Sequence, residues 1–404
     1  MGMKRTLLLV LAATLVLGGC ASQRKSVKES ISGMFDDKNP DADVLNKANE
    51  PRPLAKDFEP TIAVKSVWDG RYGKGYEKFW LKLAPVEMDG RVFVADVDGR
   101  VIAIDSATGK VAWEDRDKKR SVSGGPGAGE GRVYVGTSDA QVVARDAQTG
   151  KKLWIAQVSS EVLAAPAASN GLVFVRTGDG RLYALNAETG VQRWVLDRST
   201  PTLTLRGSAP PVVHDGQLLA GFDNGRLSAL DPATGKELWE ARLAEPNGRS
   251  DLERLVDVDA RPIVRDGVAY IDSFQGRVAA VSLEDGSLLW TRDISAFEDV
   301  AVDEENVYVT DDRSYVWALS RSDGATVWRQ KAFKNRKLTG PTRFGDFVVA
   351  GDFEGYIHWL DARTGAPVAR ERMDKKRLIS APVDIGELLL GYSSSGELSA
   401  WRVQ

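Results

Sequence analysis

The chain has 404 residues, 43% of them apolar, which is enough for a large core. Its 54 basic and 57 acidic side chains nearly cancel, so the charge gives no reason to expect nucleic acid as a partner. One cysteine and two histidines exclude an intrachain disulfide and argue against a Cys/His metal site.

The chain begins with the features of an exported lipoprotein. Lys4 and Arg5 precede an apolar run from Thr6 to Leu17, which is too short to span a bilayer and is typical of a signal peptide. The following residues up to Cys20, "LGGC", resemble a bacterial lipobox. We therefore expect residues 1–19 to be a signal peptide and Cys20 to carry the lipid, which would be the chain's only membrane contact.

Residues 20–60 are polar, charged and interrupted by prolines, without a sustained apolar period. This composition predicts a flexible tether between the lipid and a folded domain.

A repeat follows from residue 61 to residue 404. Segments such as "LNAETGVQRW" recur with a turn glycine in each, and the spacings between these glycines are 41, 40, 45, 51, 38 and 41 residues. A period near 40 with several strands per unit is typical of a propeller blade. The turn glycines are Gly109, Gly150, Gly190, Gly235, Gly286, Gly324 and Gly365.

Six of these units carry a tryptophan four residues after the glycine. A large aromatic side chain at one repeat position predicts packing between blades more than a platform for ligands. These residues are Trp113, Trp154, Trp194, Trp239, Trp290 and Trp328.

The last unit ends at Gln404 without a turn or a fourth strand. The segment "TIAVKSVWDG", residues 61–70, offers a strand that contains Trp68. We expect an all-β, eight-bladed propeller of four-stranded antiparallel blades, closed by this N-terminal strand joining the last blade, because closure removes exposed sheet edges.

The seventh unit departs from the pattern. Ala369 stands where tryptophan is expected, and Trp359 stands where the other units have alanine. We expect a compensated exchange, in which the Trp359 indole enters the same space between blades from the neighbouring strand.

No nucleophile, phosphate-loop or dinucleotide motif is found, so we expect no enzyme activity and no cofactor. "ADVDGR" fails the calcium-loop pattern, since Val94 occupies the first ligand position, and Asp96, Asp98 and Gly99 fit a hairpin turn better. We expect structural or surface roles for His214 and His358. The turn and tryptophan repeat also resembles quinoprotein dehydrogenases, which bind pyrroloquinoline quinone and calcium, and this remains the alternative.

Two long joints between units are the best candidates for binding. "DRSTPTLTLRGSAPP" carries Leu203, Leu205 and Arg206, and "LAEPNGRSDLERLVDVDARP" carries Asp257 and Asp259. In a propeller such joints emerge on one face, so exposed leucines beside an arginine and two carboxylates predict a protein-binding hot spot. Alternatively, the leucines fold back onto the propeller and Arg206 bridges to the aspartates.

The lipobox, the tether, the eight units and the segments "LTLRG" and "LVDVD" together resemble the BamB family, propeller lipoproteins of the outer-membrane β-barrel assembly machine. The resemblance implies a non-catalytic scaffold at the periplasmic face of the outer membrane of a Gram-negative bacterium. It further implies that Leu203, Leu205, Arg206, Asp257 and Asp259 bind the POTRA domains of a BamA-like central barrel subunit, and it raises unfolded outer-membrane proteins as further partners.

Overall fold

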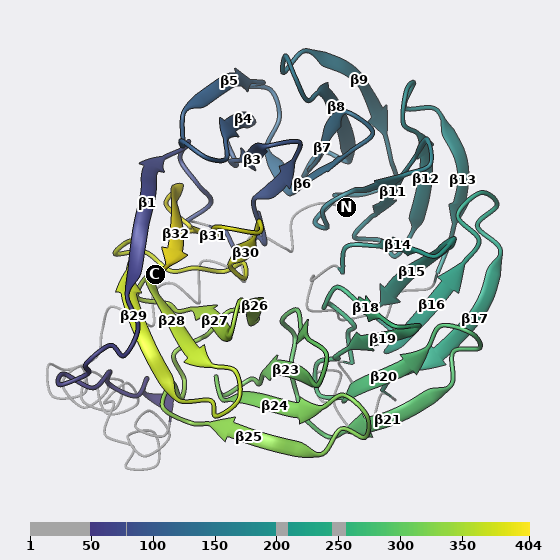
Figure 1. Cartoon of the computed structure of the whole chain (residues 1–404). Coiled ribbons are helices and arrows are strands. Elements are labelled where there is room, and N and C mark those ends of the chain that lie inside the picture. The colour runs from purple at the N-terminus through teal and green to yellow at the C-terminus, as the bar shows by residue number, and fades with distance from the viewer. Residues whose placement is uncertain (1–48, 78, 199–208, 245–255) are drawn as a thin grey trace, which may run out of the picture. The chain divides into compact units, whose positions relative to one another are not determined.

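A computed structural model of the chain describes residues 49–77, 79–198, 209–244 and 256–404. Within these ranges 32 strands form eight four-stranded antiparallel sheets, which follow one another around a central axis as the blades of a propeller (Figure 1). The expected all-β, eight-bladed architecture is therefore confirmed. No helix of the described residues is long and apolar enough to cross a membrane.

The first four blades each use four consecutive strands, given from the inner to the outer strand. Blade 1 contains β2 (Val86–Met88), β3 (Arg91–Ala95), β4 (Arg100–Asp105) and β5 (Val111–Arg116); blade 2 contains β6 (Val122–Gly129), β7 (Arg132–Thr137), β8 (Gln141–Asp146) and β9 (Lys152–Gln157); blade 3 contains β10 (Ala167–Ser169), β11 (Leu172–Arg176), β12 (Leu182–Asn186) and β13 (Gln192–Leu196); blade 4 contains β14 (Val212–His214), β15 (Gln217–Phe222), β16 (Arg226–Leu230) and β17 (Glu237–Arg242).

Blades 5 to 7 repeat this order, and blade 8 takes its outer strand from the other end of the chain. Blade 5 contains β18 (Ile263–Arg265), β19 (Val268–Ile271), β20 (Val278–Ser282) and β21 (Leu288–Arg292); blade 6 contains β22 (Ala301–Val302), β23 (Asn306–Thr310), β24 (Val316–Ser320) and β25 (Thr326–Gln330); blade 7 contains β26 (Thr342–Phe344), β27 (Phe347–Gly351), β28 (Tyr356–Asp361) and β29 (Pro367–Arg372); blade 8 contains β30 (Val383–Asp384), β31 (Leu389–Tyr392), β32 (Glu397–Val403) and β1 (Val64–Arg71).

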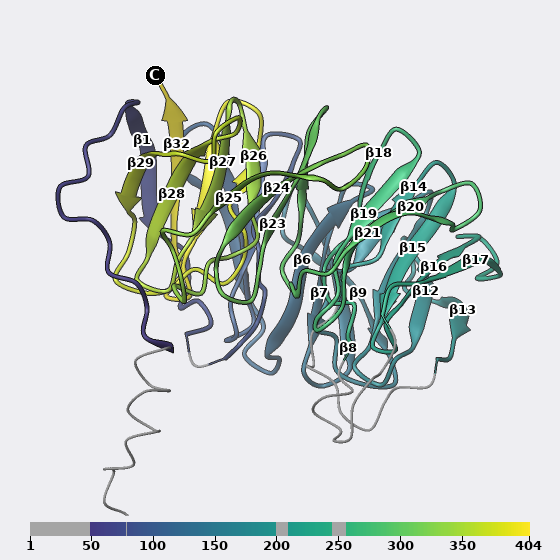
Figure 2. The same ribbon diagram turned by 90° about the horizontal axis from the view of Figure 1, so that it is seen from below.

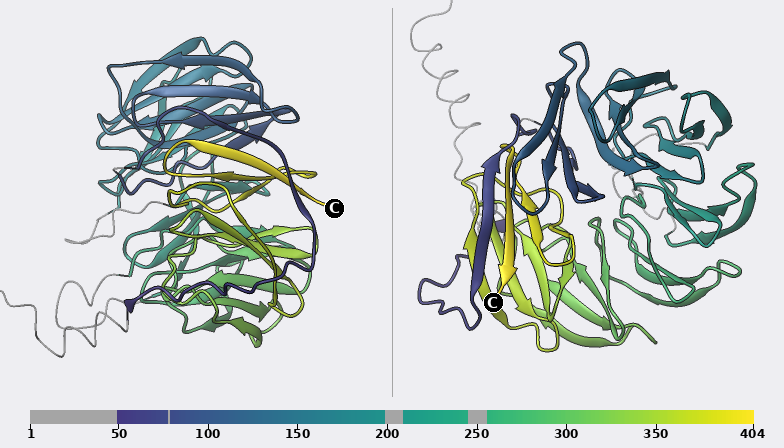
Figure 3. Two further views of the ribbon diagram at one scale, coloured as in Figure 1. Left: turned by 90° about the vertical axis from the view of Figure 1, so that its left-hand side faces the viewer. Right: turned by 45° about the horizontal axis from the view of Figure 1, so that its top comes forward.

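Strand β1 closes the ring, as predicted. It runs antiparallel to β32, from the pair Val64 and Val403 to the pair Arg71 and Glu397. Figure 3 shows β1 in purple beside the yellow C-terminal strand. Trp68 of β1 faces Ala400, so it occupies the tryptophan position that the last unit itself lacks.

Seven of the eight seams between blades use the same contact. In blade 2, for example, Trp154 Nε1 donates to the carbonyl of Ala187 in blade 3 at 2.9 Å. A Cβ atom on the turn glycine Gly190 would lie 2.6 Å from this indole, so only glycine allows the ring to approach. The equivalent indole and glycine pairs are Trp68 with Gly109, Trp113 with Gly150, Trp194 with Gly235, Trp239 with Gly286, Trp290 with Gly324, and Trp328 with Gly365. The predicted role of the tryptophans in packing between blades is confirmed.

The eighth seam, between blades 7 and 8, is built differently. Trp359 is completely buried and meets Trp401 of blade 8 edge to face, with ring centroids 6.1 Å apart. It lies opposite Ala369 in the sheet, and it packs with Leu389 of blade 8. The expected exchange is confirmed. Its cause lies in blade 8, which has no turn glycine because its outer strand comes from the beginning of the chain.

One face of the ring carries the joints between blades. In an antiparallel sheet the end of the fourth strand lies on the same side as the hairpin between the second and third strands. We call this side the connector face; Figure 2 shows the ring edge-on. The joint from β1 to β2 extends across this face, since Lys82 donates to the carbonyl of Phe297 between blades 5 and 6 at 2.9 Å.

The last part of the predicted tether contacts the propeller. Arg52 donates its backbone N–H to Lys334, and Thr61 donates to Val368 of β29 at 2.8 Å. Residues 52–61 are thus attached to blades 6 and 7, while the boundaries of signal peptide and tether stay predictions.

Candidate partner-binding face

The predicted binding residues divide into two groups. Cys20, Leu203, Leu205 and Arg206 lie outside the described residues. Asp257 and Asp259 lie within them, on the segment that leads into β18.

This segment is fixed between the hairpins of two blades. Val256, Val258 and Ala260 are buried and alternate with the two aspartates. Val258 donates its N–H to the carbonyl of Phe222 in blade 4, and Phe274 in blade 5 donates to the carbonyl of Asp257 at 3.0 Å. The backbone therefore holds the aspartates under the connector face at the junction of blades 4 and 5.

A compact acidic cluster results. Carboxylate oxygens of Asp223, Asp257 and Asp259 lie within 4.8 Å of one another, and all three side chains are buried. Arg176 of β11 forms an ion pair with Asp223, and its guanidinium also lies over the Phe222 ring. Because Arg176 already brings positive charge to these carboxylates, we assign no metal to the cluster.

Burial perturbs the acids of this region. Loss of solvent raises the pKa of Asp259 to about 6, although Arg176 opposes the shift, and the negative charge of Asp223 adds to it. Burial also raises the pKa of Asp272, the neighbouring aspartate after β19, well above its usual range. A charge on Asp259 at neutral pH therefore costs free energy in the folded state.

The expectation that Asp257 and Asp259 form an exposed polar rim around the binding site was wrong. Asp257 is 0% exposed and Asp259 is 4% exposed, so neither belongs to a solvated rim. Sequence reasoning also missed Arg176 and Asp223. The signal for Arg176 was a charged residue at the end of an apolar run, where blades 1 and 2 have the small residues Ala95 and Gly136.

Of the other residues singled out in the sequence, Asp96 and His358 have structural roles, whereas His214 at the end of β14 is partly exposed. Asp96 accepts backbone hydrogen bonds from Lys74, Asp98 and Arg100, as expected for a hairpin turn. His358 is 2% exposed and lies 3.0 Å from Asp352 through Nε2, and burial lowers its pKa.

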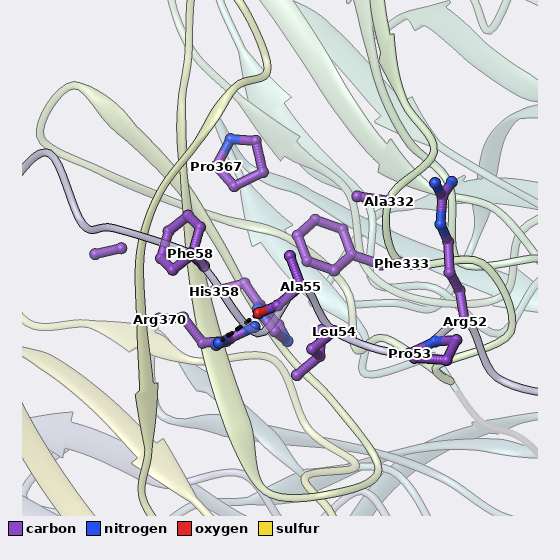
Figure 4. A pocket seen from close by; sticks show the side chains of 11 residues that line it. Arg52, Pro53, Leu54, Ala55, Phe58, Ala332, Phe333, His358, Pro367 and Arg370 are labelled. Carbon is purple, nitrogen blue, oxygen red and sulfur yellow. Dashed lines mark hydrogen bonds between the residues drawn. The ribbon is translucent and has the colours of Figure 1, made fainter.

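A cavity of about 280 Å³ lies beside His358, between the N-terminal segment and blades 6 and 7 (Figure 4). Phe58 and Phe333 contribute its aromatic walls, and Arg370 donates to the carbonyl of Ala55 across it at 3.2 Å. Its lining is mostly apolar.

Comparison with known proteins decides the family. The family model described as "Outer membrane protein assembly factor BamB" matches residues 75–123 and 97–330. The assembly factor BamB of Alkalilimnicola ehrlichii is 51% identical over 303 residues, which cover 75% of this chain and 79% of that protein. The chain belongs to the BamB family. The BamB of Xanthomonas campestris is 39% identical over 361 residues, covering 87% of this chain and 86% of the relative.

Solved structures agree with this membership. The crystal structure of BamB from Moraxella catarrhalis matches with a TM-score of 0.78 at 25% identity, covering 84% of this chain and 100% of the other. Quinohemoprotein alcohol dehydrogenase from Comamonas testosteroni reaches a TM-score of 0.66 at 14% identity, which shows a shared fold alone. Membership in a family of assembly factors confirms the expectation that this chain is not an enzyme.

Proposed function

We propose that the chain is a scaffold lipoprotein of the machine that assembles outer-membrane β-barrel proteins. Cys20 would carry the lipid that holds it at the periplasmic face of the outer membrane. Its connector face, with Leu203, Leu205, Arg206, Asp257 and Asp259, would bind the POTRA domains of the central barrel subunit.

The buried acidic cluster is the observation that carries this proposal. Carboxylates removed from solvent cost stability unless they are fully paired, and Asp259 has a raised pKa despite the nearby Arg176. In a protein without catalytic function, such a cost is best explained by binding. We infer that Asp257 and Asp259 act from beneath the surface, by setting the negative potential and the conformation of this part of the face.

Unfolded clients are the second proposed partner. Each outer strand is the edge of its sheet. Most of the outer strands expose large apolar side chains, which are Val67, Val111, Leu153, Ile155, Val195, Leu238, Leu288, Leu289 and Val327. An edge strand with exposed apolar residues is able to pair with an extended segment of another chain. We propose weak, sequence-tolerant pairing of client strands along this circumference.

Co-purification tests the main proposal. Leu203→Ala and Arg206→Ala should each abolish co-purification with the central barrel subunit from detergent-solubilised membranes. Leu238→Ala and Arg193→Ala, which alter exposed outer strands of blades 4 and 3, are the matched controls and should retain it. Retention by the first pair would remove these residues from the interface.

The anchor is tested separately by fractionation. Cys20→Ser should release the chain from outer-membrane fractions. If the serine variant stays in the membrane after a salt wash, the chain is held there by something other than the proposed lipid.

A further inference from the structure

The joint between β1 and β2 exposes two neighbouring aromatic side chains on the connector face. Phe79 is 50% exposed and Trp80 is 67% exposed, the highest value among the large apolar side chains of the described residues. A tryptophan offers about 150–250 Å² of surface for burial. Paired exposed aromatic residues on a rigid protein mark interaction sites.

This joint is held firmly on both sides of the aromatic pair. Tyr76 and Leu83 are completely buried, and the backbone N–H of Tyr76 donates to the carbonyl of Ser394 in blade 8 at 2.8 Å. Gly75 has a φ of 63° and packs against the backbone of Ser394 so closely that a Cβ atom would clash. The backbone that carries the aromatic pair is therefore fixed before a partner binds, which lowers the entropic cost of binding.

Two cations flank the Trp80 ring from two further joints. The Arg377 guanidinium lies 3.9 Å from the ring centroid, and the Lys337 ammonium lies 5.5 Å from it. Within the described ranges, no ion pair connects either cation to a carboxylate. Lys337 also has a φ of 48°, a left-handed conformation that costs a lysine stability. We call Phe79, Trp80, Lys337 and Arg377 the aromatic–cationic patch.

Charge around the patch differs from charge on the other side of the face. Residues 331–341, the joint that carries Lys337, contain four basic and no acidic side chains. The acids Asp259 and Glu298 lie on the joints between blades 4, 5 and 6. Lys82 links the two regions, since it lies 3.3 Å from Glu298 and only two residues after Trp80.

We propose that the aromatic–cationic patch is a second docking point for the same protein partner, and that it takes a segment with a carboxylate beside an apolar side chain. The apolar side chain would cover Phe79 and Trp80, and the carboxylate would pair with Arg377 and Lys337. This inference rests on the proposed function, because it assigns the patch to the partner bound at the acidic side.

The charge layout favours a protein over a membrane surface. A flat anionic bilayer that approached the patch would also approach the acidic side of the same face and be repelled there. A protein with an acidic segment and a basic segment at the right separation satisfies both sides.

The experiment measures the affinity of the full chain for a purified POTRA-domain fragment of the central subunit from the same organism. Trp80→Ala and Arg377→Glu should each weaken binding at least about tenfold, because both residues lie at the predicted centre of contact. Val191→Ala, an apolar residue that is 63% exposed in the turn before β13, is the control and should bind as the unaltered chain does.

Three results would overturn the inference, and they differ from one another. Unchanged affinity of Trp80→Ala, with weakened binding by Asp259→Asn, would remove the patch and keep the proposed function. Failure of the unaltered chain to bind the fragment would remove both. Loss of binding to phosphatidylglycerol vesicles in Trp80→Ala, with unchanged fragment affinity, would assign the patch to a membrane.

Discussion

The seams between blades and the connector face have opposite effects on the stability of the folded ring. At the seams, indoles pack on glycines of the next blade, and each indole N–H of the seven repeated seams reaches a backbone carbonyl at 2.8–2.9 Å. On the connector face, carboxylates are buried close together, and aromatic side chains are left in solvent. The first arrangement lowers the free energy of the folded ring, and the second raises it.

This difference separates the residues that hold the ring from those that bind. Changes at the seams should reduce stability and leave the affinity of the folded fraction unchanged. Changes on the connector face should reduce affinity while the free energy of unfolding stays constant or rises.

The largest expected effect is at the seam between blades 7 and 8. Trp359→Ala removes a completely buried indole, and the cavity should cost about 3–5 kcal/mol of unfolding free energy in urea melts. Adding Ala369→Trp should not restore the loss, because blade 8 offers no turn glycine. A loss below about 1 kcal/mol would show that Trp359 does not fill the core.

Two glycines of blade 3, Gly190 and Gly171, provide a matched pair of substitutions. Gly190→Ala should cost about 2–4 kcal/mol, since φ is 74° and the new methyl would meet Trp154. Gly171→Ala has nearly the same φ, 75°, but nothing within 4 Å, so it should cost only about 1–2 kcal/mol. Equal losses in denaturant would mean that contact with the indole is not what requires glycine.

Substitution of Asp259 should raise the free energy of unfolding, in contrast to the substitutions at the seams. Its folded pKa of about 6 lies above the ordinary aspartate pKa of 3.8, so the stability it contributes is present below pH 3.8 and is lost as the pH rises through 6. Asp259→Asn should therefore stabilise the chain at pH 7.5 relative to pH 4, by roughly 1–3 kcal/mol.

Asp303 is the control for this pH dependence. It is also buried, which on its own would raise the pKa, but Arg343 and Tyr308 lower it overall. Its stabilisation is present above the unfolded pKa and is lost as the pH falls, so Asp303→Asn should destabilise the chain at pH 7.5 and less so in acid. Parallel pH profiles for the two variants, measured by thermal melts, would contradict the assignment of Asp259.

The smallest expected change in stability is at the aromatic–cationic patch. Trp80→Ala removes a side chain that is 67% exposed, so the free energy of unfolding should change by less than about 0.5 kcal/mol. A substantially larger loss in urea melts would mean that Trp80 belongs to the fold and not to a binding surface.

The ring was predictable because its information is local and repeated. The glycine and the tryptophan lie four residues apart in each unit, and the exchange at Trp359 and Ala369 is visible as a change in both positions of one unit. Closure by β1 followed from counting strands, because the last unit ended one strand short.

The connector face was less predictable because its contacts connect segments that are far apart in the sequence. Arg176 and Asp223 are 47 residues apart, and nothing near either residue indicates the pair. The burial of Asp259 depends on how the hairpins of blades 4 and 5 meet. Trp80 acquires its two cations from joints more than 250 residues later in the chain, so its surroundings could not be inferred from its own segment.

The affinity of two aspartate variants for the purified POTRA-domain fragment tests the central claim most directly. Asp259 and Asp303 are both buried, but Asp303 lies in the hairpin between β22 and β23, on the opposite face of the ring. The account predicts that Asp259→Asn binds at least about tenfold more weakly and that Asp303→Asn binds normally. Equal affinities for the two folded variants would contradict it.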